Sequence, residues 1–81
     1  MLAMPTVKGI SGPYRFFFYS FDCNEPRHVH AQHERMVCKF WLDPIALEQN
    51  YGFSARELGR IRAYIVEHMA KISEAWDEHC G

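Results

Sequence analysis

The chain has 81 residues, which suffices for one compact core and not for two, so we expect a single domain over residues 1–81. Apolar residues make up 48% of the chain and aromatic residues 15%, which predicts a packed core and argues against disorder. A formal net charge of -1 excludes the overall basic field of a protein that binds mainly by neutralising phosphates. The global charge therefore favours no class of partner.

The three cysteines, Cys23, Cys38 and Cys80, are an odd number without CxxC spacing. The sequence thus indicates neither a disulfide framework nor a thiolate zinc site, and it favours a reducing compartment. The first residues lack the charged and apolar regions of a secretory signal, and no segment approaches the roughly 18 apolar residues of a membrane span. We expect a cytoplasmic protein without a membrane partner, starting at Met1 or Met4.

The first half of the chain predicts short strands separated by turns. Residues 6–10 precede a Ser-Gly-Pro turn, residues 14–20 contain four consecutive aromatic side chains, and residues 28–32 alternate between polar and apolar. Residues 36–42 follow after a tight connection, so the last two runs should form an antiparallel hairpin. About four strands are therefore expected, in an order that the sequence does not specify.

The second half of the chain predicts helix. Asp43 is a good N-cap before Pro44, which indicates a short helical turn over residues 45–49. The run from Ser54 to Glu57 is a capping box, and it begins a long helix over residues 54–79. Six apolar residues of this helix share one face that should bury against the sheet: Leu58, Ile61, Ile65, Met69, Ile72 and Trp76. The expected fold class is α+β, a small antiparallel sheet with one long C-terminal helix packed on one face.

Five segments carry a resemblance to a known family: Met4-Pro5-Thr6-Val7, Tyr14-Arg15-Phe16-Phe17-Phe18-Tyr19-Ser20, Glu25-Pro26-Arg27-His28-Val29-His30, Lys39-Phe40-Trp41-Leu42-Asp43-Pro44 and Gly52-Phe53-Ser54-Ala55-Arg56-Glu57-Leu58. On these segments the whole chain resembles the family Domain of Unknown Function 4160. The resemblance implies a prokaryotic source and a gene beside that of another small protein, in an arrangement similar to a toxin–antitoxin pair. It implies no activity. Many members carry a further histidine in the loop where this chain has Asp22-Cys23-Asn24.

His28 and His30 are the leading candidates for chemistry, because side chains two apart on a strand point to the same face. A metal site would need a third ligand, from His33, Glu34 or Cys23, and such a set would suit zinc with an open position. Without a metal, the pair would form local hydrogen bonds on a polar strand face. We expect no cofactor, and a zinc ion is the alternative.

The same pair could instead act as general acid and base on an RNA phosphodiester. Arg15 or Lys39 would then stabilise the charge of the transition state. This interpretation predicts a histidine-dependent ribonuclease that needs no metal. Whether the protein is an enzyme stays open at this point.

A binding face is the third interpretation. If the helix covers the face of Phe16, the opposite face presents aromatic and basic side chains on an open sheet: Arg15, Phe17, Tyr19, His28, His30, Lys39 and Trp41. Such a face suits stacking of single-stranded RNA, a partner protein or a second copy of the chain. Arg56 and Arg60, four apart on the helix, could hold a phosphate or an acidic partner, or could form an ordinary solvated face.

We therefore predict a toxin–antitoxin-like component that acts through a protein or RNA contact on the open sheet face. A protein contact is favoured over RNA, and the neighbouring small protein and a homodimer are the partners considered. The ribonuclease and the small zinc-binding domain are the alternatives.

Overall fold

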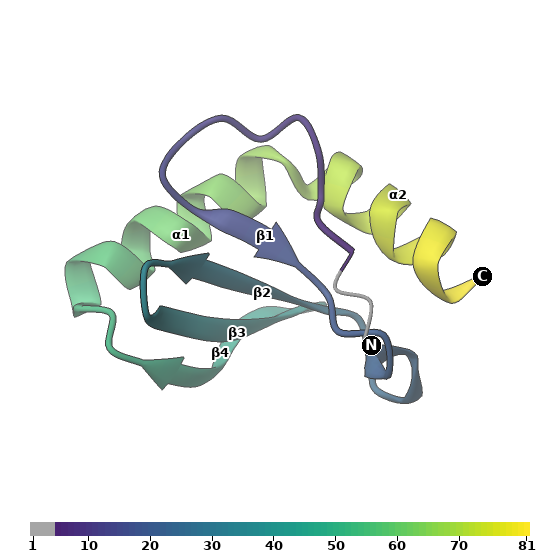
Figure 1. Cartoon of the computed structure of the whole chain (residues 1–81), viewed down its shortest axis with the longest axis horizontal. Helices are drawn as coiled ribbons and strands as arrows, with labels where there is room; N and C mark the ends of the chain where they lie inside the picture. Colours follow the sequence, from purple (N-terminus) through teal and green to yellow (C-terminus); the bar gives the residue numbers. More distant parts are fainter. Residues whose placement is uncertain (1–4) are drawn as a thin grey trace.

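Four strands and two helices make up the fold in the computed structural model, which describes residues 5–81 (Figure 1). The strands are β1 (Arg15–Phe17), β2 (His28–His33), β3 (Met36–Leu42) and β4 (Ile45–Tyr51), and a short 3-10 helix, η1 (Asp22–Asn24), lies between β1 and β2. The helices are α1 (Ala55–Glu67) and α2 (Met69–Cys80). The sheet is antiparallel in the order β1-β2-β3-β4, so each strand pairs with its neighbours in the sequence. The expected α+β class and a sheet of four strands are confirmed, but the set of strands differs, because residues 6–10 are not among them and β4 is.

The long C-terminal helix is divided in two, which corrects the prediction of one helix over residues 54–79. The N-cap is as expected, because Ser54 Oγ accepts a hydrogen bond of 3.2 Å from the Glu57 N–H. The interruption is His68, with φ -108° and ψ 22°. Backbone hydrogen bonds continue on both sides of it, from His68 N to Tyr64 O and from Ile72 N to His68 O. The helix is therefore interrupted at one residue. The apolar residues keep their helical spacing across His68, so the sequence pattern did not predict the break.

The N-terminal segment is less regular than predicted. Residues 6–10 form no strand, and Thr6 makes a single bridge to Phe17. The segment still lies along β1, since Val7 N donates to Phe16 O and Phe18 N donates to Pro5 O. Gly9, with φ +85°, turns the chain away from an extended path. Met1 and Met4 lie outside the described residues.

Strand β4 replaces the helical turn that we expected over residues 45–49, so that prediction was wrong. Asp43 and Pro44, joined by a cis peptide bond, form the turn of a hairpin in which Leu42 pairs with Ile45. The segment Ala46-Leu47-Glu48-Gln49 consists of good helix formers. The outer backbone groups of β3 offer this segment a ladder of hydrogen bonds, and this tertiary pairing overrides the local preference.

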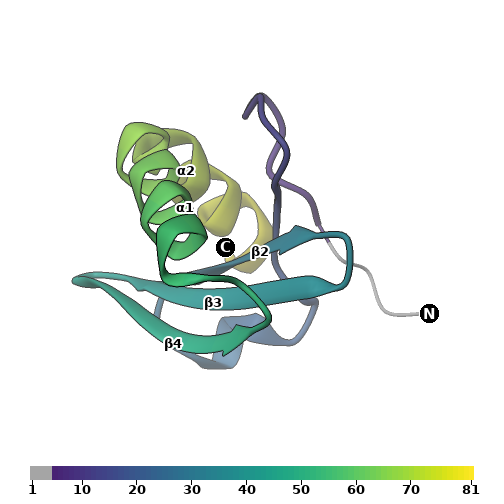
Figure 2. The same cartoon turned by 90° about the vertical axis from the view of Figure 1, so that its left-hand side faces the viewer.

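Both helices cover one face of the sheet (Figures 1 and 2). The face that packs against them is the one expected, because Phe16, Val29, Ala31, Cys38 and Phe40 are all buried in one cluster. The helices contribute four fully or almost fully buried side chains to that cluster: Ile61, Ile65, Ile72 and Trp76. Burial raises the pKa of the Cys38 thiol to about 11, so this cysteine is a neutral packing residue.

A disulfide bond joins Cys23 to Cys80, and Cys38 is the free cysteine. This bond corrects the interpretation that the odd cysteine count indicates no disulfide. The two partners are 57 residues apart, and only the fold brings the loop after β1 to the end of α2. Within residues 5–81, neither helix has the length and hydrophobicity needed to cross a membrane.

Candidate functional site

The second face of the sheet carries the histidines, and it is covered. We expected this face to be open, but Phe17, His28, His30 and Lys39 are between 0% and 9% exposed. The loop of residues 18–27, which follows β1 and contains η1, lies over this face, because its Asp22 contacts His28 and His30 and its Glu25 pairs with Lys39. The aromatic and basic face is therefore a second buried layer, and only its margin reaches the surface.

The carboxylate of Asp22 lies at the centre of this layer. Asp22 is 2% exposed, and its Oδ2 accepts a hydrogen bond of 2.7 Å from the Tyr19 N–H. The same oxygen lies 3.0 Å from Nε2 of His28 and 3.0 Å from Nε2 of His30. Sequence reasoning missed Asp22, because a single acidic residue in a polar loop gives no signal of burial.

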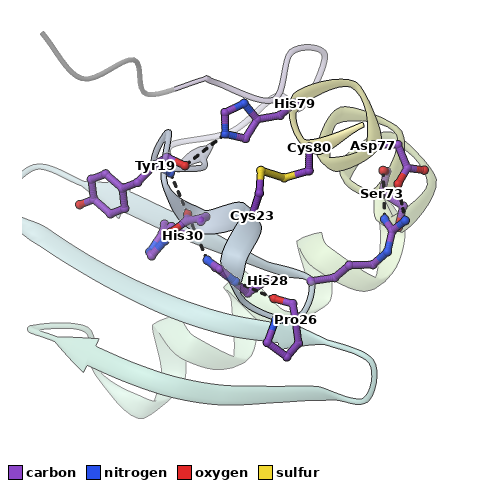
Figure 3. The surroundings of a disulfide bond; sticks show 11 residues. Tyr19, Cys23, Pro26, His28, His30, Ser73, Asp77, His79 and Cys80 are labelled. Atoms are coloured by element: carbon purple, nitrogen blue, oxygen red, sulfur yellow. Dashed lines mark hydrogen bonds and ion pairs between the residues drawn. A yellow bond between two sulfur atoms is a disulfide. The ribbon is translucent and has the colours of Figure 1, made fainter.

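His28 is completely buried and is fixed by its other ring nitrogen. Its Nδ1 lies 2.8 Å from the carbonyl oxygen of Pro26 (Figure 3). A carbonyl can only accept, so Nδ1 carries the proton and donates it. The ring lies edge-on between Trp41 and Trp76, with centroids 5.6 and 5.1 Å away. Its Nε2 faces Asp22 at 3.0 Å but is too poorly aligned to make a hydrogen bond.

His30 lies beside His28 on β2, and its Nε2 makes an aligned hydrogen bond with Asp22. The ring stacks on Phe17 at 5.3 Å and contacts the ring of Tyr19 at 4.7 Å. Burial lowers the pKa of His30, and the Asp22 carboxylate opposes that effect only in part. The neutral imidazole is therefore favoured.

The other ligands considered from the sequence do not join this centre. His33 is at the far end of β2, where its ring lies 6.0 Å from that of Tyr14. Glu34 is in the turn that follows, with φ +56°. Cys23 belongs to the disulfide, beside His79, which interacts with the carbonyl of Tyr19 (Figure 3).

The cations of this face are held by internal contacts. Lys39 forms a salt bridge with Glu25, and this hydrogen bond lowers the pKa of the Glu25 carboxyl. The Lys39 ammonium also lies 4.5 Å from the ring centroid of Trp41. Arg15 lies over Phe17 at 4.7 Å and donates to Thr6 Oγ1.

The remaining candidates are separate from this centre. Arg56 and Arg60 are exposed on α1, which covers the opposite face of the sheet. Trp41 is partly exposed, and its Nε1 donates to Glu48 of β4 over 2.8 Å. Tyr19 is partly exposed and stacks on Phe21. Their roles in binding stay predictions.

Chemically, the centre combines one carboxylate oxygen and two imidazole nitrogens. The ligand atoms of Asp22, His28 and His30 all lie within 4.8 Å of one another. A pair of acid–base catalysts must reach a substrate, and complete burial of His28 leaves it without such access. One carboxylate oxygen and two imidazole nitrogens this close together are a ligand set that can hold a metal ion.

The sequence pattern of one family, described as "Domain of unknown function (DUF4160)", matches residues 14–77. No curated protein matches, and no solved structure matches. The matched region includes all four strands, the loop with η1, helix α1 and most of α2. The chain thus belongs to the family Domain of unknown function (DUF4160).

Proposed function

We propose that this chain is a protein-binding module that takes up an extended segment of a different polypeptide along the edge of β4. This refines the prediction of a toxin–antitoxin-like component and moves the contact from the buried histidines to an exposed strand. The observation that carries the proposal is the exposure of β4, in which six of seven residues are exposed. An edge strand presents unpaired N–H and C=O groups to which another strand can add.

The two edges of the sheet differ in a way that supports this choice. β1 is three residues long, and residues 5–7 lie along its outer side. β4 has seven residues, and within residues 5–81 it pairs with β3 alone. It lacks the lysines and prolines with which exposed edges commonly prevent pairing.

Apolar surface gathers at the same edge. Leu47 and Tyr51 of β4 are 45% and 61% exposed. Near the start of β4, a hollow of about 410 Å³ is lined by Trp41, Pro44 and Ala46 among others. A side chain from an added strand could enter this hollow, which would give the backbone pairing its specificity.

Charge favours a protein over RNA as the occupant. β4 contains no cation, and Glu48 is its one charged residue. Lys39, the nearest cation on the sheet, is already paired with Glu25. Arg27, which lines the hollow near the start of β4, is paired with Asp77, so neither cation is a free counter-charge for phosphate groups.

Charge also favours a different polypeptide over a second copy. A two-fold antiparallel pairing that uses all seven residues of β4 places Glu48 opposite its own copy. Directly opposed like charges destabilise a strand pair. A partner strand with a lysine or arginine opposite Glu48 avoids this repulsion.

Co-expression with the small protein that the family resemblance implies beside its gene tests the proposal. We expect a complex that survives purification and that Leu47→Lys weakens at least tenfold. The matched control is Val66→Lys, which changes an equally apolar side chain, 53% exposed, on α1. A complex that Leu47→Lys leaves intact, or no complex at all, would contradict the proposal, and a homodimer that Leu47→Lys disrupts would replace it.

A further inference from the structure

We propose that Asp22, His28 and His30 form a binding site for a divalent zinc ion beneath the loop of residues 18–27. This inference uses other residues than β4 and does not depend on the proposed function. It begins from three ligand atoms, Asp22 Oδ2, His28 Nε2 and His30 Nε2, that lie within 4.8 Å of one another and belong to buried residues.

The tautomer of His28 is the first argument. Because Nδ1 donates to the Pro26 carbonyl, the neutral ring has a lone pair and no proton at Nε2. That nitrogen is fully buried and has no hydrogen-bond partner. A backbone carbonyl that holds the distal N–H, with the other nitrogen directed inward, is the usual arrangement of a metal-bound histidine.

The contact between His28 and Asp22 is the second argument. Nε2 and Oδ2 are 3.0 Å apart, yet the ring nitrogen does not point along the line between them. Two ligands of one ion can lie this close without a hydrogen bond between them, because neither atom has to donate a proton to the other. With metal–ligand distances of about 2.0–2.1 Å, neighbouring ligand atoms lie roughly 2.9–3.4 Å apart.

The second histidine fits the same ion. His30 Nε2 is also 3.0 Å from Asp22 Oδ2 and uses that direction for a hydrogen bond in the metal-free centre. On binding, zinc would take the place of the proton on Nε2, and the neutral ring would carry its proton on Nδ1. Imidazole binds a metal in its neutral form.

The types of ligand atom indicate the class of ion. Two imidazole nitrogens with one carboxylate oxygen suit zinc and related first-row ions better than calcium or magnesium, which prefer oxygen ligands.

A second group, Cys23, His79 and Cys80, also brings possible ligand atoms together. Its two sulfur atoms are bonded to each other, and a disulfide provides no thiolate for a metal. The disulfide instead fastens Cys23, the neighbour of Asp22, to the end of α2. It thereby holds the carboxylate in its place over β2.

Zinc titration of the oxidised, untagged protein, stripped with a chelator, tests the proposal by competition with a chromophoric indicator. We expect one zinc ion per chain, and affinities at least 100-fold lower for Asp22→Asn and for His30→Gln. The matched control is His33→Gln, a change of the same kind on the same strand, and it should leave the affinity unchanged. Circular dichroism checks that each variant is folded.

Cobalt(II) gives a second measurement that does not depend on the variants. Wild-type protein should develop visible ligand-field bands without a sulfur charge-transfer band, and one equivalent of zinc should remove them. Failure of folded wild-type protein to bind zinc at micromolar concentration would overturn the proposal. Equal losses for His33→Gln and His30→Gln, or a cobalt spectrum with sulfur bands, would overturn it as well.

Discussion

Helices α1 and α2 cover one face of the sheet with aliphatic and aromatic side chains, whereas a short loop covers the other with a carboxylate. On the helix face, Ile61, Ile65 and Ile72 are completely buried, and their side chains are purely aliphatic. On the loop face, Asp22 and His28 are buried just as deeply, and their geometry depends on directed contacts.

The difference between the faces shows where stability and specificity reside. Burial of aliphatic groups is stabilising whatever their exact orientation, so the helix face can supply most of the free energy of folding. Buried polar groups stabilise little in net terms, and they are costly when left without a partner. The polar centre therefore contributes directed geometry more than net stability.

Truncation on the helix face should have the largest effect on stability. Ile65→Ala leaves a cavity at a position with 0% exposure, and we expect the free energy of unfolding to fall by about 2–5 kcal/mol. Urea denaturation measures this loss. Val66→Ala, at the neighbouring exposed position, should change stability by less than about 0.5 kcal/mol. Similar losses for the two variants would mean that α1 does not pack as described.

Loss of the disulfide should rank next and should act on the loop face. A loop closed across 57 residues corresponds to about 4 kcal/mol in the chain-entropy model, and measured losses are commonly 2–4 kcal/mol. The double variant Cys23→Ser/Cys80→Ser should therefore unfold at a lower urea concentration. A reducing agent should destabilise the wild type to the same extent and leave the variant unchanged. A variant as stable as the oxidised wild type would contradict the assignment.

The smallest effect belongs to the ion pair that connects the loop to α2 at the surface. Arg27 pairs with Asp77, and the two side chains are 43% and 59% exposed. Because solvent screens such pairs, Arg27→Ala should lower stability by less than about 1 kcal/mol in a thermal melt. A loss of several kcal/mol would show that this pair, and not the disulfide, fastens the loop.

The sequence predicted the layers of this molecule better than their connections. Strand 36–42 was predicted with its observed bounds, because turn residues flank a run of β-forming residues. The helix-facing set around Phe16 and Val29 followed from alternation along the strands. Strand β4 was missed, since Ala46-Leu47-Glu48-Gln49 favours helix locally and only pairing with β3 makes it extended.

The candidate site was predicted in part for a similar reason. Periodicity placed His28 and His30 on one face of a strand, as observed. It did not reveal that a loop folds over that face, because loop paths depend on distant contacts such as that between Cys23 and Cys80. Because the path of the loop was not predicted, His33 was a more obvious third ligand than Asp22. Asp22 is six residues before His28 in the sequence but adjacent to it in space.

The most direct test of the polar centre is an NMR measurement of the imidazole nitrogens in metal-free protein, before and after addition of one equivalent of zinc. We predict that His28 carries its proton on Nδ1, and that zinc shifts Nε2 of both His28 and His30 while His33 is unaffected. A proton on Nε2 of His28 that persists when zinc is added would contradict the account, because Asp22 and His28 would then form only an internal hydrogen bond.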